Sequence, residues 1–252
     1  MKISIVTVCY NSEKTIEDTI KSIAAQTYKN IEYIIIDGGS NDMTNDIINK
    51  YKDIVSIHVS EADDGLYDAM NKGIKLATGD VVGILNSDDI LFDENVIVNI
   101  VNSFSTDIDG VYSDLIYVKQ NDLNSVSRLY SSKIFSNKLI KFGFMIPHPT
   151  FYVKKSCYDK YGYYKNDYRV AADFELITRF IKSDVKLKRL PIFSVKMREG
   201  GISSRGIMWR IHQNFEIVRA CKENNIQTNI FYIMLKLPYK LLTLCARFFI
   251  KA

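Results

Sequence analysis

Two adjacent carboxylates follow a short apolar run in this chain, and oxygen ligands of that kind suit a hard metal ion. The run ends at Leu85, and Asn86-Ser87 connects it to Asp88 and Asp89. Where strands and helices alternate, such a run is usually the buried strand of a parallel sheet, and residues just past it lie where open α/β folds bind ligands. One or two carboxylates and the phosphates of a substrate commonly hold Mg²⁺ or Mn²⁺ there. An isolated Asp-Asp pair is more often a turn or a helix cap, so the rest of the chain must decide.

Further acidic residues follow other expected strands. Asp37 ends an apolar strand and precedes Gly38-Gly39. A carboxylate there can accept hydrogen bonds from a nucleotide base or sugar, and the glycines let a ligand approach the backbone closely. Asp63 and Asp64 precede the next expected helix. The residues alone leave two alternatives open, an ordinary strand-to-helix turn at Asp37 and a solvated helix start at Asp63-Asp64.

Two familiar nucleotide-binding motifs are absent from the sequence. Cys9-Tyr10-Asn11-Ser12 follows the first expected strand in place of G-x-G-x-x-G, and no G-x-x-x-x-G-K-[ST] occurs. A bound nucleotide would therefore need another counter-charge for its diphosphate, and a metal ion on Asp88 would supply it.

The elements that must position these residues alternate along the first half of the chain. Helices are expected between the strands, with Asn11-Ser12 and Asp93 as N-caps, and another helix is expected after Asp173. Residues 121–127 predict a surface loop and residues 198–205 a mobile loop. The alternation predicts a parallel sheet with helices on both faces. The expected strands are residues 3–10, 31–36, 55–59, 81–85 and 111–118.

Composition indicates an ordinary globular chain of 252 residues, with 47% hydrophobic and 25% charged residues. Charge is uneven along it. Residues 1–130 hold 10 Lys and Arg against 21 Asp and Glu, a balance of −11, and residues 131–252 hold 23 against 8, a balance of +15. The acidic half suits a bound cation, and the basic half suits a phosphate-bearing substrate or a membrane surface. No basic motif with interleaved aromatics supports nucleic acid as a partner.

Cysteine usage and the N-terminus favour the cytosol. The four cysteines lie far apart without a C-x-x-C pair, which indicates neither a zinc site nor a disulfide scaffold. The apolar N-terminal run is short and soon reaches polar and charged residues, which predicts a strand rather than a signal peptide. No window of 18 uncharged apolar residues exists, so a spanning helix is not expected.

Five motifs occur in order along the first third of the chain, and together they carry a family resemblance. The chain resembles family 2 glycosyltransferases of the GT-A fold, of the type that assembles bacterial surface polysaccharides such as O-antigen and capsule. The resemblance is close over about residues 1–115 and looser over residues 145–205. It implies a mostly parallel nucleotide-binding sheet flanked by helices, followed by a C-terminal acceptor region. The motifs are Thr7-Val8-Cys9-Tyr10-Asn11, Asp37-Gly38-Gly39-Ser40-Asn41-Asp42, Asp63-Asp64-Gly65-Leu66-Tyr67-Asp68-Ala69-Met70-Asn71-Lys72-Gly73, Ala77-Thr78-Gly79-Asp80 and Leu85-Asn86-Ser87-Asp88-Asp89.

The resemblance implies roles for the matched positions on the donor side. Tyr10 and Asp37 would hold the nucleotide base, with Asp63 or Asp64 nearby. Asp88 would ligate Mn²⁺ or Mg²⁺ in the position of the family's D-x-D motif.

The chain departs from the family pattern at that metal motif, where Asn86 replaces the first acid. An asparagine can ligate through its carbonyl oxygen but brings no charge. The resemblance therefore leaves open whether Asn86 or Asp89 completes the metal site with Asp88.

The resemblance also implies an acidic catalytic base in the acceptor half. The family often has Glu-Asp before a helix, and Ala172-Asp173 stands at that place, which makes Asp173 the candidate base. Pro147-His148-Pro149-Thr150 resembles the segment upstream of the base, so His148 would line the acceptor pocket. Gly200-Gly201-Ile202-Ser203 matches a late motif that would cover the bound donor. Without the resemblance, Asp173 would be a helix N-cap and His148 a structural residue.

The implied residues fit one reaction. Sugar transfer from a nucleoside diphosphate needs the leaving diphosphate neutralised by a Lewis acid and the attacking hydroxyl deprotonated by a carboxylate. A single displacement at the anomeric carbon inverts configuration, and the sequence offers no specific nucleophile for a retaining reaction. Processive relatives carry Q-x-x-R-W, whereas this chain has only Trp209-Arg210, which favours one sugar per encounter.

The C-terminal residues predict an amphipathic helical tail. Lys236, Lys240, Arg247 and Lys251 would lie within roughly 60° of one another on a helix, beside a broad apolar face. This is the pattern of a helix in a membrane interface, and Pro238 would kink or restart it. Packing of the helix on the core or against a second copy is the alternative.

The sequence as a whole predicts an inverting, metal-dependent, non-processive hexosyltransferase, peripheral on the cytoplasmic face of the inner or plasma membrane. Its partners would be a nucleotide sugar, a lipid-linked saccharide acceptor and an anionic membrane surface. A UDP-sugar is the favoured donor. Formation of a homo-oligomer through the C-terminal helix stays open. Residues 1–120 would bind the nucleotide sugar, residues 121–228 the acceptor within the same domain, and residues 229–252 the membrane. The alternatives are a nucleotidyltransferase and a non-catalytic, membrane-bound protein that binds sugar nucleotides or acts as a scaffold.

Overall fold

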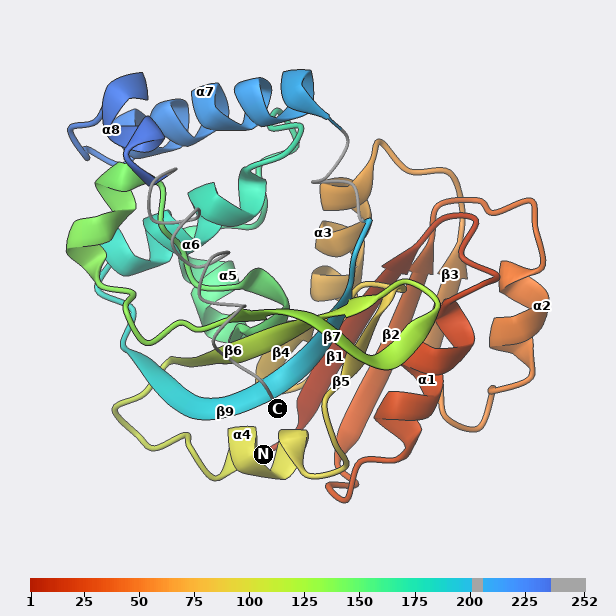
Figure 1. Cartoon of the computed structure of the whole chain (residues 1–252). Helices are drawn as coiled ribbons and strands as arrows, with labels where there is room; N and C mark the ends of the chain where they lie inside the picture. The colour runs from red at the N-terminus through yellow and green to blue at the C-terminus, as the bar shows by residue number, and fades with distance from the viewer. Residues whose placement is uncertain (201–205, 237–252) are drawn as a thin grey trace.

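Strand β1 (Ile3–Cys9) lies at the centre of the parallel half of the sheet, and all seven of its residues are buried. It is rich in β-branched Ile, Val and Thr, which suit a strand that is covered on both faces. β2 (Ile31–Asp37) and β4 (Val81–Ile84) pair with it on either side, and β3 (Ile57–Ser60) pairs with β2. All these pairings are parallel, as the alternation of elements predicts (Figure 1).

The second half of the sheet is mixed, within the residues that the computed structural model describes, 1–200 and 206–236. Its strands are β5 (Asp89–Leu91), β6 (Gly110–Lys119), β7 (Asp122–Tyr130), β8 (Tyr152–Lys154) and β9 (Leu187–Arg198). The order continues from β4 through β8, β6 and β9 to β5, and β7 pairs with β6. β6 runs parallel to β9 but antiparallel to β7 and β8. The short hairpin between β6 and β7 cannot make the crossover that a parallel pair requires, so these strands run antiparallel.

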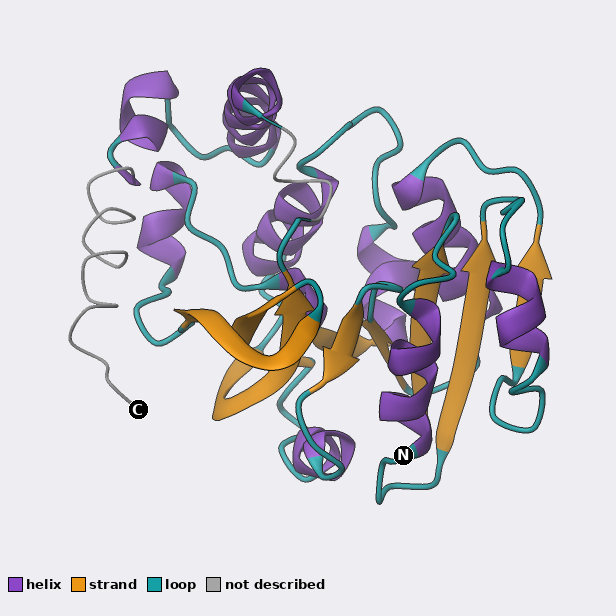
Figure 2. Cartoon of the chain, turned by 45° about the vertical axis from the view of Figure 1, so that its right-hand side comes forward, coloured by secondary structure: helices purple, strands orange, loops and turns teal. Residues whose placement is uncertain are grey.

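Helices cover both faces of the sheet (Figure 2). Successive strand residues point to opposite faces, and this decides which helix each one meets. Tyr33 and Ile35 pack with the first, second and fourth helices, whereas Ile34 and Ile36 pack with the third, fifth and sixth. The helices are α1 (Ile16–Ala24), α2 (Thr44–Asn49), α3 (Leu66–Leu76), α4 (Val96–Val101), α5 (Lys155–Tyr161), α6 (Ala172–Lys182), α7 (Ile207–Glu223) and α8 (Ile230–Met234), with 3₁₀ turns η1 (Asn137–Phe142) and η2 (His148–Thr150).

Helix α3 crosses the parallel strands closely at Gly73. An ideal Cβ at this position would lie 2.2 Å from Cγ1 of Val6 and 3.3 Å from Cγ1 of Ile36. The missing side chain therefore sets how near α3 approaches β1 and β2, and the start of this helix is one wall of the candidate site.

Several local predictions differ from the structure. Most of residues 121–127 belong to β7, where exposed and partly buried residues alternate because this edge strand has one face in solvent. Thr15 and Asn95, rather than Asn11-Ser12 and Asp93, are the N-caps of α1 and α4. Arg198, expected to open a loop, is the buried last residue of β9, because β9 pairs there with β6.

The predicted tail is only partly within the described residues. Lys236, expected on an exposed basic stripe, is 8% exposed, and its ammonium lies against Gly143. Pro238, Lys240, Arg247 and Lys251 lie outside the described residues. Over residues 1–200 and 206–236, no helix has both the length and the apolar character that crossing a membrane requires.

Candidate active site at the carboxyl edge of the sheet

The acidic turn, residues 86–89, joins β4 to β5, and neighbouring elements hold its backbone. Thr19 of α1 directs its hydroxyl at the carbonyl oxygens of Ser87, 3.0 Å away, and Asp89, 2.7 Å away. The hydroxyl of Ser12, which follows β1, lies 2.9 Å from that of Ser87. The turn is therefore fixed by contacts from two other parts of the parallel half of the sheet.

Arg198 is a further support of the acidic turn, and sequence reasoning missed it. Its side chain is 5% exposed, and Nη1 donates to the carbonyl oxygen of Asp88 at 2.8 Å, while Nη2 pairs with Asp18. Arg198 lies about 110 residues further along the chain. No local motif signals this contact, because it depends on the pairing of β9 with β5.

Two buried oxygens in the acidic turn have no hydrogen-bond partner among the described residues, Oδ1 of Asn86 and Oδ1 of Asp89. Asp89 is fully buried, and burial together with the charge of Asp88 holds the pKa of Asp89 well above its ordinary value. Burial also raises the pKa of Asp88. Unpartnered oxygens beside a carboxylate fit a hard divalent cation. The described residues contain no cluster of three or more His, Cys, Asp or Glu that could hold a metal.

His148 in η2 lies within electrostatic range of Asp88. Burial lowers the pKa of His148 to about 4, and the charge of Asp88 opposes that shift. The imidazole is therefore neutral near pH 7, and it can donate or accept a hydrogen bond beside the acidic turn.

Asp37, at the end of β2, is fully buried, and its carboxylate stabilises the loop that follows β2. Its Oδ2 accepts hydrogen bonds from the amide of Ser40 at 2.9 Å, from Asn45 at 3.0 Å and from the hydroxyl of Ser60 at 2.6 Å, and its Oδ1 accepts from the hydroxyl of Ser40. These bonds lower the pKa of Asp37 although burial opposes them. A carboxylate offers about four lone-pair directions, so the protein's own donors occupy this one.

Tyr10 and Asp63 lie on neighbouring loops at the same edge. Tyr10 follows β1 and is 61% exposed, so its ring is open to a ligand. Asp63 packs closely against Gly38, directly after β2, since an ideal Cβ at Gly38 would lie 2.5 Å from Oδ2 of Asp63. The sequence suggested that this glycine would let a ligand approach the backbone, whereas in the structure the side chain of Asp63 makes that close approach. Asp64 is exposed beside it.

Asp173 lies in the first turn of α6, beside the start of α3. The amide of Phe174 donates to its Oδ1 at 2.7 Å. Asp173 is within electrostatic range of Tyr67 on α3, and the ring of Tyr67 stacks on Tyr164 with centroids 5.7 Å apart. Burial raises the pKa of Asp173 to about 6, and the charge of Glu216 adds to the rise. Because α3 follows β3, Asp173 shares the carboxyl edge of the sheet with the acidic turn.

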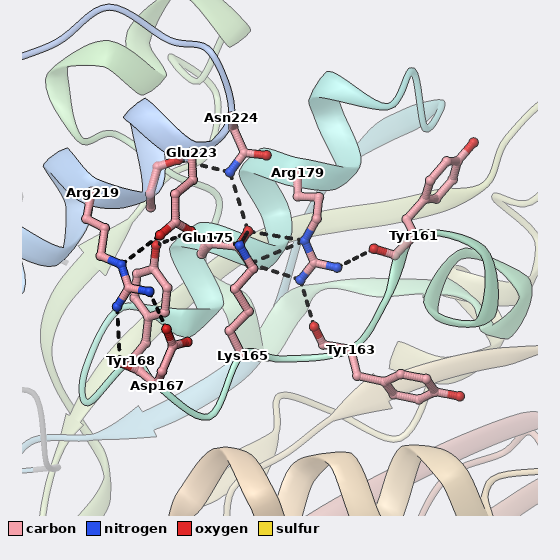
Figure 3. Close-up of polar contacts among 11 residues, drawn as sticks. Tyr161, Tyr163, Lys165, Asp167, Tyr168, Glu175, Arg179, Arg219, Glu223 and Asn224 are labelled. Carbon is pink, nitrogen blue, oxygen red and sulfur yellow. Dashed lines mark hydrogen bonds and ion pairs between the residues drawn. The ribbon is translucent and has the colours of Figure 1, made fainter.

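A polar network holds α6 in place (Figure 3). Glu175 is fully buried and pairs with Nη2 of Arg179 at 2.9 Å and with Nζ of Lys165 at 3.0 Å. Arg179 also donates to the carbonyl oxygen of Tyr163 at 2.7 Å, and Lys165 reaches Glu223 of α7 at 2.8 Å. Removing one partner of a buried ion pair is strongly destabilising, so this network fixes α6, and with it Asp173, against α7.

The sequence-predicted residues thus gather at one edge. Tyr10, Asp63 and the acidic turn follow parallel strands, and Asp173 joins them through α3. Gly201, Ile202 and Ser203 of the late motif lie outside the described residues.

Comparisons with known proteins agree with this arrangement. The family model of glycosyl transferase family 2 matches residues 4–164. An uncharacterised glycosyltransferase of Mycobacterium tuberculosis is 33% identical over 179 residues, which cover 70% of this chain and 68% of the relative. A PGL/p-HBAD biosynthesis glycosyltransferase of Mycobacterium bovis is 29% identical over 192 residues, 74% of this chain and 72% of that one. The chain belongs to glycosyltransferase family 2.

Solved structures confirm the predicted GT-A fold. TarS of S. aureus (residues 1–349), in complex with UDP-GlcNAc, superposes with a TM-score of 0.69 at 19% identity, over 96% of this chain and 72% of that one. The mannosyltransferase PcManGT of Pyrobaculum calidifontis, in complex with GDP-Man and Mn²⁺, superposes with a TM-score of 0.68 at 18% identity, over 97% and 73%.

Proposed function

We propose that this enzyme transfers one sugar per encounter from a nucleotide sugar to an acceptor hydroxyl, by a single inverting displacement. The observation that carries the proposal is the arrangement of two chemistries at one sheet edge. The acidic turn offers unpartnered buried oxygens of Asn86 and Asp89 beside Asp88, and Asp173 offers a carboxylate with a pKa of about 6. The first set suits the counter-ion of a diphosphate, and the second suits a general base.

On the donor side, Asp88 would hold Mn²⁺ or Mg²⁺ with the oxygens of Asn86 and Asp89. The cation would supply Lewis-acid stabilisation of the leaving diphosphate. The exposed ring of Tyr10 would stack on the base, and Asp63, with Asp64 beside it, would accept hydrogen bonds from the nucleoside. Asp37, expected from the sequence to touch the base, instead holds the loop after β2, because its lone pairs are occupied.

On the acceptor side, Asp173 accepts the proton of the attacking hydroxyl. Its ionised form dominates above about pH 6. The neutral imidazole of His148 lines the acceptor pocket and orients the acceptor through a hydrogen bond. No covalent intermediate is needed, and the configuration at the anomeric carbon is inverted.

The acceptor we propose is a lipid-linked saccharide in the synthesis of a surface polysaccharide such as O-antigen or capsule, reached from the cytoplasmic face of the membrane. The balance of +15 in residues 131–252 supports a partner rich in phosphate. A UDP-sugar is the favoured donor, because the TarS structure holds UDP-GlcNAc.

A screen of nucleotide sugars tests this function. The full chain, Mn²⁺ and a lipid-linked acceptor are incubated with each donor, and released nucleoside diphosphate and extended acceptor are both measured. We expect one donor to give the two products in equal amounts. Release of pyrophosphate from a nucleoside triphosphate would instead indicate a nucleotidyltransferase. Donor binding without turnover would indicate a binding or scaffold protein.

A further inference from the structure

Helix α7 is apolar on two opposite faces. Its inner face packs on the core through Ile217, Ala220 and Cys221, which are buried. Its outer face carries Met208, 77% exposed, and Phe215, 59% exposed, with Ile211 between them. These three residues follow at spacings of three and four and form one stripe along the helix. A single exposed apolar residue needs no explanation, whereas a contiguous patch indicates a surface that something covers.

Helix α8 extends this stripe. It lies beside α7 at the same end of the molecule (Figure 1). Its Ile233 is fully buried, while Phe231, Met234 and Leu235 are 77%, 49% and 59% exposed. We call the outer residues of α7 and α8 together the apolar end face.

Positive charge borders the apolar end face. Lys222 lies seven residues after Phe215 and so continues the stripe of α7, and η1, which packs on α8, adds Lys138 and Lys141. Of the acids that the structure describes on α7, α8 and η1, Glu216 is buried, and Glu223 pairs with Lys165 and Arg219. Two copies of so basic a face would repel each other, whereas an anionic surface would attract it. Arg219 also lies beside the stripe, but its charge is balanced by Asp167 and Glu223.

We propose that the apolar end face docks on an anionic lipid bilayer. Apolar side chains of α7 and α8 enter the headgroup region, and the neighbouring Lys residues of α7 and η1 contact lipid phosphates, as amphipathic helices do in membrane interfaces. The inference deepens the proposed function, because a lipid-linked acceptor would require contact with a bilayer. It reaches beyond the tail predicted from the sequence, residues 229–252, because α7 and its stripe lie before residue 229, whereas the α8 part of the face lies within that tail.

Vesicle binding, measured without donor or acceptor, tests the docking surface separately from the enzymatic function. The full chain is sedimented with vesicles of phosphatidylglycerol and phosphatidylcholine, or of phosphatidylcholine alone. We expect binding to the anionic vesicles that falls as salt rises. Ile211→Ser with Phe215→Ser should weaken partition on the order of tenfold or more, because two apolar side chains no longer enter the interface.

A matched control removes the same apolar character elsewhere. Val126→Ser with Leu129→Ser changes two exposed residues of β7 and should leave vesicle binding unchanged. Both double variants retain the C-terminal residues and the core, so equal melting temperatures are expected. Equal vesicle binding by the two variants would overturn the proposal. A wild-type dimer that the α7 variant converts to a monomer, with vesicle binding intact, would identify a second copy as the occupant instead.

A separate observation concerns the inner face of α7. Glu216 is 7% exposed, and its carboxylate accepts hydrogen bonds from three consecutive backbone amides, those of Arg169 at 2.7 Å, Val170 at 2.9 Å and Ala171 at 2.8 Å. This segment ends where α6 begins, two residues before Asp173. The structure assigns Glu216 a positioning role, in which it fixes the segment that aims Asp173. This role rests on Asp173 being the base.

Kinetics of Glu216→Gln test the positioning role. The amide retains the size of the side chain but replaces one acceptor oxygen with a donor that faces backbone N–H groups. Since misplacement of a catalytic group by about 1 Å can cost on the order of 10²-fold, we expect a loss of kcat up to that size with the donor KM unchanged. The pH midpoint of kcat should fall, because Glu216 is the charged group that raises the pKa of Asp173, whereas Tyr67 and Tyr164 face it as neutral hydroxyls.

Two further variants separate positioning from folding. Glu216→Asp keeps the charge but shortens the reach, so kcat should fall without a change in the pH midpoint. Glu17→Gln alters a partly exposed carboxylate of α1 that pairs with Lys21 and accepts a hydrogen bond from Tyr51, away from residues 169–171 and from the network around α6, and it should leave both quantities unchanged. Normal kcat and pH midpoint in Glu216→Gln would overturn the role. Normal turnover in Asp173→Asn would refute the proposed base itself.

Discussion

A carboxylate acts as a base near neutral pH only when its surroundings bring its pKa close to that pH. Asp173 meets this condition because burial raises its pKa to about 6. The contrast with Asp37 is instructive. Asp37 is fully buried, but four donors stabilise its charge and lower its pKa, so it is suited to holding a loop and not to exchanging a proton.

Replacing Asp173 with Asn should cost on the order of 10²–10⁴-fold in kcat, because the amide keeps the size of the side chain but cannot accept the proton. Donor binding, measured by calorimetry, should persist. In the wild type, kcat should rise with pH and reach half its maximum near pH 6, where Asp173 ionises. Near-normal turnover by the variant would leave Asp173 only a structural role, as an acid in the first turn of α6, where Ala171 is the N-cap.

The same pKa shift has a consequence for stability. An acid whose pKa is higher in the folded state disfavours folding once it ionises, so this contribution is absent below about pH 4 and grows as pH rises through 6. Asp173→Asn should therefore raise the free energy of unfolding at pH 7.5 by roughly 1–3 kcal/mol but not at pH 3.5. Urea denaturation at the two pH values measures the difference, and an equal gain at both would exclude this origin.

Removing Asp88 should abolish transfer, because the leaving diphosphate loses its counter-charge. EDTA should inactivate the wild type, and added Mn²⁺ or Mg²⁺ should restore it. Asp64→Ala, at an exposed acid on a neighbouring loop, is the control and should keep its metal requirement. Full transfer by the wild type in EDTA would exclude a metal from the reaction.

At the scale of single residues, the sequence indicated that the acidic turn and Tyr10 follow strands, because each comes directly after an apolar run, and the family resemblance singled out Asp173, whose role stays a prediction. Arg198 and Glu216 were not predictable. Each acts on a backbone segment distant in sequence, Arg198 through strand pairing and Glu216 through helix packing. The sequence also could not show that the lone pairs of Asp37 are occupied, because Asn45 and Ser60 reach its carboxylate only after the chain has folded.

At the scale of elements, the first four strands and α3 were predictable because each has a strong apolar period bounded by polar residues. β8 and β9 were not expected. β9 alternates charged and apolar residues irregularly, since its pairing with β5 and β6 leaves parts of it exposed. The expectation of a parallel sheet is therefore correct for β1 to β4 and incomplete for the mixed half.

The packing of α3 on β1 gives a test at this scale. In an exposed helix, Gly→Ala stabilises by about 1 kcal/mol. Gly73→Ala should instead destabilise by about 1–3 kcal/mol, because its Cβ would meet Val6 and Ile36 and force α3 outward. Lys75→Ala on the exposed side of the same helix is the control. Thermal unfolding measures the stability of both variants. A Gly73→Ala variant that is more stable than the wild type would show that the contact between α3 and the sheet can accommodate a methyl group.

At the scale of the whole molecule, the two oppositely charged halves of the sequence share one continuous sheet. The acidic half supplies the parallel strands and the acidic turn, and the basic half supplies Asp173 and the helices around the apolar end face. Charge distinguished an acidic half from a basic half of the sequence, but it could not predict how the halves join, because the pairing of β9 with β5 and β6 has no signature in composition.

The configuration of the product tests the central claim most directly. Once a donor has been found, NMR of the purified product gives the anomeric configuration of the new glycosidic bond. A single displacement with Asp173 as the base predicts inversion, so an α-linked donor must give a β-linked product. Retention of the donor's configuration would contradict the account, because it would require a mechanism in which Asp173 is not the base of a single attack.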